Sequence, residues 1–407
     1  MNNSQLLEGY KLTEVGVIPK DWDVFTIGQT VTLINGRAFK PSDWKTSGLP
    51  IIRIQNLNDP MAAYNYYEDI VEDRYYVNNG DILFAWSGTK ESSFGARMWR
   101  GQKAILNQHI FRVVPNEKNI LSQYLLLALK RFQEDIEKKS HGFKASFVHI
   151  KKSDLENTHL AVPPLPEQRS IATALSDMDE LLGGLDRLIA KKRDLKQAAM
   201  QELLTGKTRL QGFDGEWEET TLGEIGECVI GLTYKPENVV KYGLLVLRSS
   251  NVQNGQLAYA DNVYVNLRVA DHLVTRIGDI LICVRNGSRA LIGKCAVINA
   301  NAAGLTFGAF MSIYRTNYWR FIAHTFQSDD IQKQIRDNIG ATINQITNKD
   351  MKAFRVLLPP ENEQIAIASI LSDMDTEIAA IEQRRNKTRD LKQAMMQELL
   401  TGRIRLV

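Results

Sequence analysis

An internal repeat constrains this chain more than any other feature of its sequence. The stretch RDLKQAAMQELLTGKTRL at 193–210 returns as RDLKQAMMQELLTGRIRL at 389–406, an offset of 196 residues. Without insertion or deletion, 27 of the 48 positions in 163–210 are identical at that offset. A fixed period of this kind indicates that one structural unit is written twice.

The similarity continues more faintly upstream of these stretches. WDVFTIG from Trp22 matches WEETTLG from Trp217, and GDIL from Gly80 matches GDIL from Gly278. Each copy therefore has a divergent front and a nearly identical back. We divide the chain into two fronts, residues 1–160 and 211–357, and two backs, residues 161–210 and 358–407.

The fronts mix short β-favouring runs with turn signals, as in LPIIRIQNLND, NNGDILFAW and RIGDILICVRNG. Runs of Val, Ile and Phe bounded by Gly, Asn and Asp are typical of strands joined by tight turns. A few helical stretches follow, such as 121–139. The fronts are therefore predicted to be α+β globular domains with curved antiparallel sheets.

The backs are predicted to be long helices. Glu167 and Glu363 follow proline pairs and would lie in a first helical turn, where a carboxylate is favourable. Apolar residues then recur at spacings of three and four up to Gly206 and Gly402, as in a coiled-coil seam. A helix of about 39 residues would be about 58 Å long.

Two helices with such narrow apolar stripes should pack on each other. An antiparallel coiled coil would send the two fronts to opposite ends, related by an approximate two-fold axis. Duplex DNA has a matching local two-fold symmetry.

Composition limits the class of protein. Of the 407 residues 44% are hydrophobic and 24% charged, which is typical of a globular protein. The polar start has no signal-peptide core and no apolar run reaches about 20 residues, so we expect a cytoplasmic protein. Three isolated cysteines and six scattered histidines predict neither a disulfide framework nor a metal site. The net charge of +3 permits DNA binding without requiring it.

The repeated backs keep charged and amide positions that an apolar seam does not need. Two copies of one partner protein, docked on equivalent helix surfaces, would account for this; the alternative is that these charges only solvate a long helix. The predicted partner-binding residues are Glu167, Gln168, Arg193, Lys196, Glu202, Glu363, Gln364, Arg389, Lys392 and Glu398.

Taken together, these motifs resemble the specificity subunit of type I restriction-modification enzymes over essentially the whole chain. YKLTEVGVIPKDW, GDIL in both halves, PPLPEQ with PPENEQ, and LLTGK with LLTGR carry the resemblance. The second helix start departs from the first at Leu165 and Pro166. The resemblance implies that the fronts are target recognition domains, each reading one half of a split, asymmetric DNA site.

The resemblance also implies partners. The helices would set the spacing between the half-sites and dock two methyltransferase subunits, and restriction subunits would join that core. S-adenosylmethionine, and ATP with magnesium, would then belong to the partner subunits, with no cofactor in this chain.

The chain itself lacks the motifs of a DNA-modifying enzyme. An adenine methyltransferase needs a polar residue before, and an aromatic residue after, its Pro-Pro pair to clamp a flipped base. Here Val162 and Leu358 precede the pairs. GKT at Gly206 lacks the earlier glycine of a phosphate-binding loop, because Gln201 stands there. We therefore expect a non-catalytic subunit.

DNA reading would then depend on basic and amide side chains of the fronts, which contact phosphates or base edges. Positions kept in both copies (Lys40/Lys235, Arg53/Arg248, Asn56/Asn251) are predicted to contact phosphate or to serve the scaffold. Positions that differ, Trp86-Ser87-Gly88 against Arg285-Asn286-Gly287, are predicted to read bases. The remaining candidates are Arg37, Gln55, Lys90, Arg97, Asn107, Gln108, Lys144, His149, Lys151, Lys152, Arg289, Lys294, Asn344, Gln345 and Lys349.

A second function class fits the same organisation. The coiled coil could join protein partners while the fronts bind peptides or glycans. Salt would separate the two, because a DNA binder loses affinity steeply as salt rises and a peptide adaptor need not.

Overall fold

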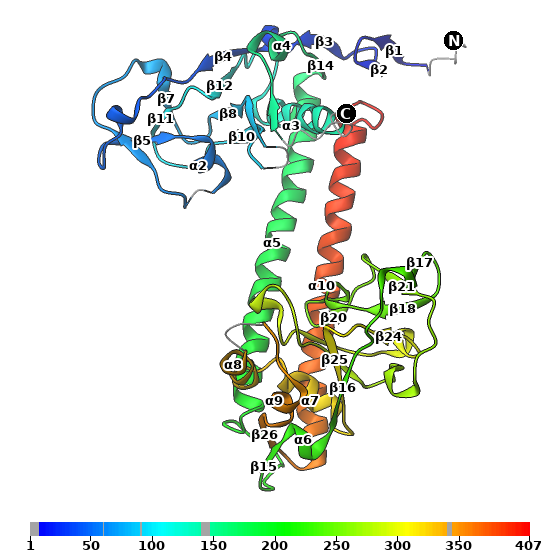
Figure 1. The fold of residues 1–407 in the computed structure, drawn as a ribbon. Coiled ribbons are helices and arrows are strands. Elements are labelled where there is room, and N and C mark those ends of the chain that lie inside the picture. The colour runs from blue at the N-terminus through cyan, green and yellow to red at the C-terminus, as the bar shows by residue number, and fades with distance from the viewer. Residues whose placement is uncertain (1–7, 60, 90–91, 140–146, 340–343) are drawn as a thin grey trace. The chain divides into compact units, whose positions relative to one another are not determined.

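Two helices of 39 residues each dominate the computed structural model, which describes residues 8–59, 61–89, 92–139, 147–339 and 344–407 (Figure 1). Helix α5 spans Leu165–Leu203 and helix α10 spans Glu361–Leu399. Each helix has an acidic first turn, which the helix dipole favours. Gly206 and Gly402 follow with φ of 68° and 69°, in the left-handed region that glycine adopts most easily.

The chain divides into two compact units, and each combines one front with parts of both helices. Unit 1 comprises residues 1–185 and 384–407, and unit 2 comprises residues 186–383. The boundary falls within α5 and within α10. Each unit is therefore built from both copies of the repeat.

Apolar burial shows how the helices pack inside each unit. In unit 1 the core includes Ile171 near the start of α5 and Leu399 at the end of α10. In unit 2 it includes Leu203 at the end of α5 and Ile367 near the start of α10. The helices thus run antiparallel in both units, which confirms the predicted direction.

The front of unit 1 contains two four-stranded sheets. The first has the order β10 (Gly95–Met98), β8 (Ile82–Ala85), β12 (Ile110–Pro115), β4 (Val31–Asn35), all antiparallel. The second has the order β6 (Asn65–Tyr67), β5 (Leu49–Ile52), β11 (Ala104–Leu106), β7 (Tyr76–Val77). Three two-stranded pairs complete it: β1 (Tyr10–Thr13) with β2 (Gly16–Pro19), β3 (Asp23–Thr26) with β14 (His159–Val162), and β9 (Ser87–Thr89) with β13 (Phe147–His149).

The front of unit 2 has a similar plan, also with two four-stranded sheets. Its first sheet has the order β16 (Glu227–Ile230), β25 (Met311–Arg315), β22 (Ile280–Cys283), β23 (Cys295–Val297). The second has the order β17 (Val239–Val240), β21 (Val263–Val265), β18 (Leu244–Leu247), β24 (Thr306–Phe307). The two pairs are β15 (Glu218–Thr221) with β26 (Arg355–Leu358) and β19 (Val252–Gln253) with β20 (Gln256–Leu257).

Shorter α-helices flank these sheets. Unit 1 contains α1 (Ile27–Thr30), α2 (Ile54–Asn58), α3 (Ser122–Lys139) and α4 (Lys152–Glu156). Unit 2 contains α6 (Leu222–Ile225), α7 (Trp319–Thr325), α8 (Asp329–Asn338) and α9 (Asn348–Lys352). The predicted α+β class is confirmed. Each unit also contains one parallel strand pair, β11 with β5 and β18 with β24.

The fold explains why the GDIL motif occurs in both copies. Gly80 and Gly278 turn the chain with φ of 95° and 88°, and the apolar residues that follow enter the central strands β8 and β22. All four residues of each strand are buried. Among the described residues no helix is long and apolar enough to cross a membrane.

Candidate nucleic-acid interface

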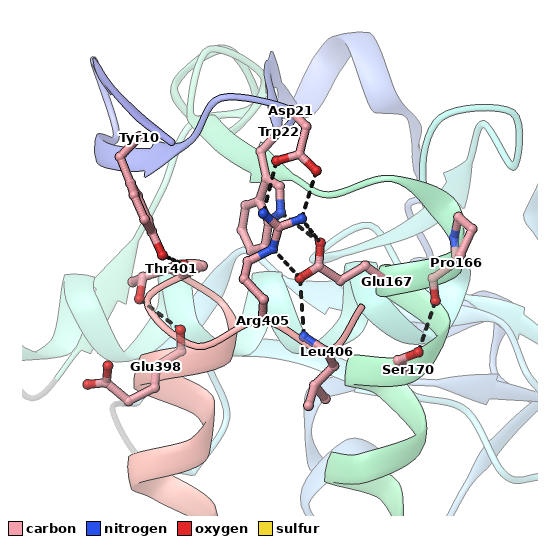
Figure 2. A network of polar contacts seen from close by, with 11 residues as sticks. Tyr10, Asp21, Trp22, Pro166, Glu167, Ser170, Glu398, Thr401, Arg405 and Leu406 are labelled. Atoms are coloured by element: carbon pink, nitrogen blue, oxygen red, sulfur yellow. Dashed lines mark hydrogen bonds and ion pairs between the residues drawn. The ribbon is translucent and has the colours of Figure 1, made fainter. Parts of the chain in front are cut away.

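Each unit contains a buried carboxylate in the first turn of one long helix. In unit 1, Glu167 of α5 accepts a hydrogen bond from the indole Nε1 of Trp22 at 2.9 Å and is 2% exposed. Arg405 donates to both oxygens of the same carboxylate at 2.7 and 2.8 Å (Figure 2). Arg405 also bonds Asp21 at 2.9 and 2.7 Å. These hydrogen bonds raise the pKa of Arg405 and lower that of Asp21.

Unit 2 contains the same arrangement, built from the repeat equivalents. Glu363 of α10 accepts from the Nε1 of Trp217 at 3.0 Å and from Arg209 at 2.7 Å on each oxygen. We call Trp22, Glu167 and Arg405 the first clamp, and Trp217, Glu363 and Arg209 the second clamp. Each clamp joins a front to the start of one helix and to the segment after the other helix.

The buried glutamines next to these carboxylates also serve the fold. Gln168 donates to the carbonyls of Asn119 and Pro163 at 2.9 Å each and accepts from the backbone of Leu121 at 2.8 Å. Gln364 donates to the carbonyl of Pro359 at 2.7 Å. The expectation that Glu167, Gln168, Glu363 and Gln364 contact a partner is therefore corrected. Their side chains are at most 5% exposed and offer no surface to another protein.

The repeated lysines form ion pairs between the helices. Lys196 of α5 binds Asp375 of α10 at 2.6 Å in unit 2, and Lys392 of α10 binds Asp179 of α5 at 2.5 Å in unit 1. The two pairs are repeat equivalents. They explain without any partner why the second Asp of SDMD and the Lys of RDLKQ occur in both copies, and they remove Lys196, which is 8% exposed, as a docking residue.

Three of the four remaining predicted partner-binding residues have partners within their own units. Arg193 pairs with Glu382, Glu202 accepts from Thr208 at 2.7 Å, and Glu398 pairs with Arg403 at 3.2 Å. Arg389 is exposed.

A repeated apolar residue of the helices also lies on the surface, and the sequence pattern did not single it out. Leu195 is 47% exposed and its equivalent Leu391 is 55% exposed. Both follow an exposed Arg-Asp pair. We call Arg193-Asp194-Leu195 and Arg389-Asp390-Leu391 the repeated helix patches. The sequence shows that this leucine is identical in both copies. The heptad pattern does not predict that it is exposed.

In unit 1, several predicted DNA-reading residues lie together after the central strand. Trp86 follows β8, and its ring centroid lies 4.9 Å from that of His149 and 5.4 Å from that of His109. Its Nε1 donates to the carbonyl of Gln108 at 3.2 Å. His109 and His149 are exposed. We call Trp86, His109 and His149 the Trp86 cluster; Asn107 and Gln108 adjoin it, and His109 was not predicted.

In unit 2, the corresponding loops gather Arg285, Asn286, Arg289, Asn344 and Gln345, which we call with Phe310 the Arg285 cluster. The guanidinium carbon of Arg285 lies 5.0 Å from the ring centroid of Phe310, a residue that is 55% exposed and was not predicted. Arg285 forms a β-bridge with Gln345.

The backbone corrects the alignment of these loops. Ile150 donates to the carbonyl of Trp86, and Ile346 donates to that of Val284, at 2.9 Å each. Trp86 therefore corresponds to Val284, and Arg285 corresponds to Ser87, which is 8% exposed. Aligning the two copies on Gly88 and Gly287 placed the loops one residue out of register.

Among the positions kept in both copies, Asn56 and Asn251 are scaffold residues. They are 1% and 0% exposed, and each accepts from the backbone N–H three residues earlier, at 3.1 and 2.9 Å. Burial excludes a direct DNA contact by these two amides. The adjacent arginines are engaged internally, Arg53 with Asn65 at 2.9 Å and Arg248 with Asp261 at 2.7 Å.

The remaining candidates fall into three groups. Arg37 lies 4.5 Å from the ring centroid of Tyr67, and Gln55, Arg97 and Lys294 bond backbone carbonyls. The side chains of Lys40, Lys151, Lys152, Lys235 and Lys349 are exposed. Lys90 and Lys144 lie outside the described residues.

Comparison with known proteins places the chain in a family. The family model for the type I restriction modification DNA specificity domain matches residues 19–190 and again residues 214–388. The chain therefore belongs to that family and carries two copies of the domain. It is a non-catalytic specificity subunit of the type I restriction-modification class, as its repeat and motifs predicted.

Two curated relatives align along nearly the whole chain. The chain is 28% identical over 426 residues to the putative type I restriction enzyme MjaX specificity subunit of Methanocaldococcus jannaschii, covering 98% of this chain and 97% of that protein. It is 25% identical over 410 residues to the MjaVIII specificity subunit of the same organism, covering 96% and 94%.

Solved structures match the fold at lower identity. A chain from a study of complex assembly and conformational transition of the type I R-M system matches with a TM-score of 0.60 at 20% identity, covering 95% of this chain and 99% of that one. The S subunit of M. genitalium matches with a TM-score of 0.57 at 18% identity, covering 96% and 97%. Both matches extend over both units.

Proposed function

We propose that this chain selects the DNA sequence on which a type I restriction-modification complex acts. Each unit binds one half of a split, asymmetric site in double-stranded DNA, and the two long helices set the spacing between the halves. The helices also hold two methyltransferase subunits, which restriction subunits join. S-adenosylmethionine, and ATP with magnesium, are used by those partners in the cytoplasm.

One observation carries the DNA-reading part of this proposal. The two units share their main sheets, clamps and buried asparagines, yet they differ at solvent-accessible positions of the same loops. His109 of unit 1 corresponds to Phe310 of unit 2, and His149 corresponds to Gln345. Such a difference is needed if two similar frameworks are to recognise unlike half-sites, because sequence is read at base edges by particular side chains.

The opposite pattern supports the docking of two identical partners. The repeated helix patches are identical in sequence and exposed in both units, whereas Lys196, Glu167 and Glu363 are buried. An apolar side chain with flanking charges on a helix surface is a common basis of protein–protein contacts. Each patch is therefore proposed to bind one methyltransferase subunit, through Leu195 in unit 2 and Leu391 in unit 1.

Mapping of N6-methyladenine tests the proposal directly. Genomes of cells with and without this chain are compared, with the methyltransferase subunit present in both. Loss of methylation at one split motif is the expected result. An unchanged methylation pattern would contradict the proposal and favour an adaptor that binds peptides or glycans.

A further inference from the structure

The Arg285 cluster contains an arginine whose backbone is fixed from two sides. The backbone N–H groups of Val284 and Arg285 both donate to the carbonyl of Phe310 at 3.1 Å, and Ile346 donates back to Val284 at 2.9 Å. The bridge between Arg285 and Gln345 completes this small ladder. The Cα of Arg285 is therefore held in place before any ligand arrives.

The side chain of Arg285 is also oriented. Its guanidinium lies over the ring of Phe310, with 5.0 Å between the guanidinium carbon and the ring centroid. Contact with a ring face engages the guanidinium plane and leaves the N–H groups at its edge available. Within the described part of the chain, no carboxylate or carbonyl oxygen accepts a hydrogen bond from this guanidinium.

Neighbouring polar groups are engaged within the protein. Asn286 donates to Ser249 at 2.9 Å and accepts from the backbone of Ser288 at 3.0 Å. Asn344 donates to the carbonyl of Gly287 at 3.0 Å and accepts from Arg289 at 2.9 Å. These bonds brace the loop, and they leave Arg285 as an exposed, pre-oriented donor beside it.

We infer that Arg285 reads a guanine in the half-site bound by unit 2. This rests on the proposed function of the chain. The planar fork of an arginine matches the N7 and O6 acceptors that guanine presents in the major groove. Because the stacking on Phe310 orders the side chain in advance, less conformational freedom is lost when the contact forms.

A phosphate contact is the competing role for an exposed arginine. A phosphate contact serves any DNA sequence, and so the same residue would suit both units. The position of Arg285 is instead occupied in unit 1 by Ser87, which is buried and paired with His149 in the β-ladder. A change of residue type at one position of a shared framework favours base reading over phosphate positioning.

The test uses the full chain with its methyltransferase subunits and a duplex carrying the motif that methylation mapping assigns to the wild type. Each guanine of the second half-site is replaced in turn by 7-deazaguanine, which removes the N7 acceptor. For the wild type, one replacement should weaken binding about tenfold to one-hundredfold. For Arg285→Lys, which keeps the charge and loses the fork, the same replacement should have little effect.

Arg336→Lys is the matched control, since Arg336 is an exposed arginine of unit 2 that lies in α8, outside the Arg285 cluster. It should keep the wild-type response to 7-deazaguanine. The inference is overturned if Arg285→Lys weakens binding equally to all duplexes, including one with a scrambled second half-site, because that outcome marks a phosphate contact. If the wild-type complex shows no sequence preference at all, the proposed function itself fails.

Discussion

Arg405 holds the buried carboxylate of Glu167 with two hydrogen bonds of 2.7 and 2.8 Å across 238 residues of sequence. Arg209 holds Glu363 in the same way in unit 2, at 2.7 Å for each bond. In each unit, the buried glutamate is thus paired with an arginine from the copy of the repeat to which the glutamate does not belong. Each clamp is therefore assembled from residues of both copies of the repeat.

Removal of the arginine from a clamp should destabilise its unit. Arg405→Ala leaves a carboxylate that is 2% exposed without its counter-charge, and such a loss typically costs about 3 kcal/mol. Arg403→Ala is the control, because its pair with Glu398 is largely exposed and is worth at most about 1 kcal/mol. Urea unfolding measures both. Equal effects of the two substitutions would contradict the structural role of the clamp.

The two interhelical ion pairs should differ in strength. The side chains of Lys196 and Asp375 are 11% and 38% exposed, whereas those of Lys392 and Asp179 are 16% and 53% exposed. Water screens the second pair more than the first. Double-mutant cycles in which each lysine is replaced by Met and each aspartate by Asn should therefore give a coupling energy of about 1–2 kcal/mol for the first pair and less for the second. A larger coupling energy for Lys392–Asp179 would contradict the expectation that the more exposed pair is the weaker one.

Acid should destabilise unit 2 through His324. Burial, together with the nearby ammonium of Lys196, lowers the pKa of this imidazole to about 4, although Asp375 opposes the shift. Nε2 of His324 lies 3.1 Å from the hydroxyl of Ser372, and Nδ1 lies 3.9 Å from Asp375.

The unfolded chain then binds a proton near pH 6.5, before the folded one does. The stability that neutral His324 confers is therefore complete above pH 6.5 and is lost as the pH falls toward 4. His324→Gln should make the urea midpoint less dependent on pH over that interval. Replacing His272, which is exposed, by Gln should leave the pH dependence unchanged. An identical pH profile for wild type and His324→Gln would exclude His324 as the cause.

Docking of the methyltransferase should depend on the repeated helix patches. Leu195→Asp and Leu391→Asp should each lower the number of bound methyltransferase subunits from two to one, and the double variant should bind none. Mass photometry of the assembled complex gives these counts. Leu188→Asp is the control, since Leu188 is 40% exposed but Arg384 occupies its repeat position. Two bound subunits in the Leu195→Asp variant would remove this patch from the interface.

Exchange of one front should change one half of the target only. A chimera that replaces residues 221–357 with the equivalent segment of another specificity subunit keeps Arg209, Trp217 and Glu363, and so keeps the second clamp. Methylation mapping should then show a new second half-site beside an unchanged first half-site. A change in both halves would mean that the two units do not read DNA independently.

Several features of this fold were predictable because they depend on local sequence. The long helices follow from apolar spacing, from acidic first turns at Glu167 and Glu363, and from Gly206 and Gly402 after their ends. The central strands follow from the repeated GDIL. These signals act over a few residues, and so a single copy of the sequence contains them.

Tertiary structure decided which side chains meet. The sequence determined that Glu167 and Lys196 recur, but packing made them internal, as partners of Arg405 and Asp375, instead of contacts for another protein. It also placed Phe310 beneath Arg285 and left Leu195 and Leu391 exposed. The physical reason is distance along the chain, since a hydrogen bond or a buried surface forms only when folding brings together residues that no local pattern connects.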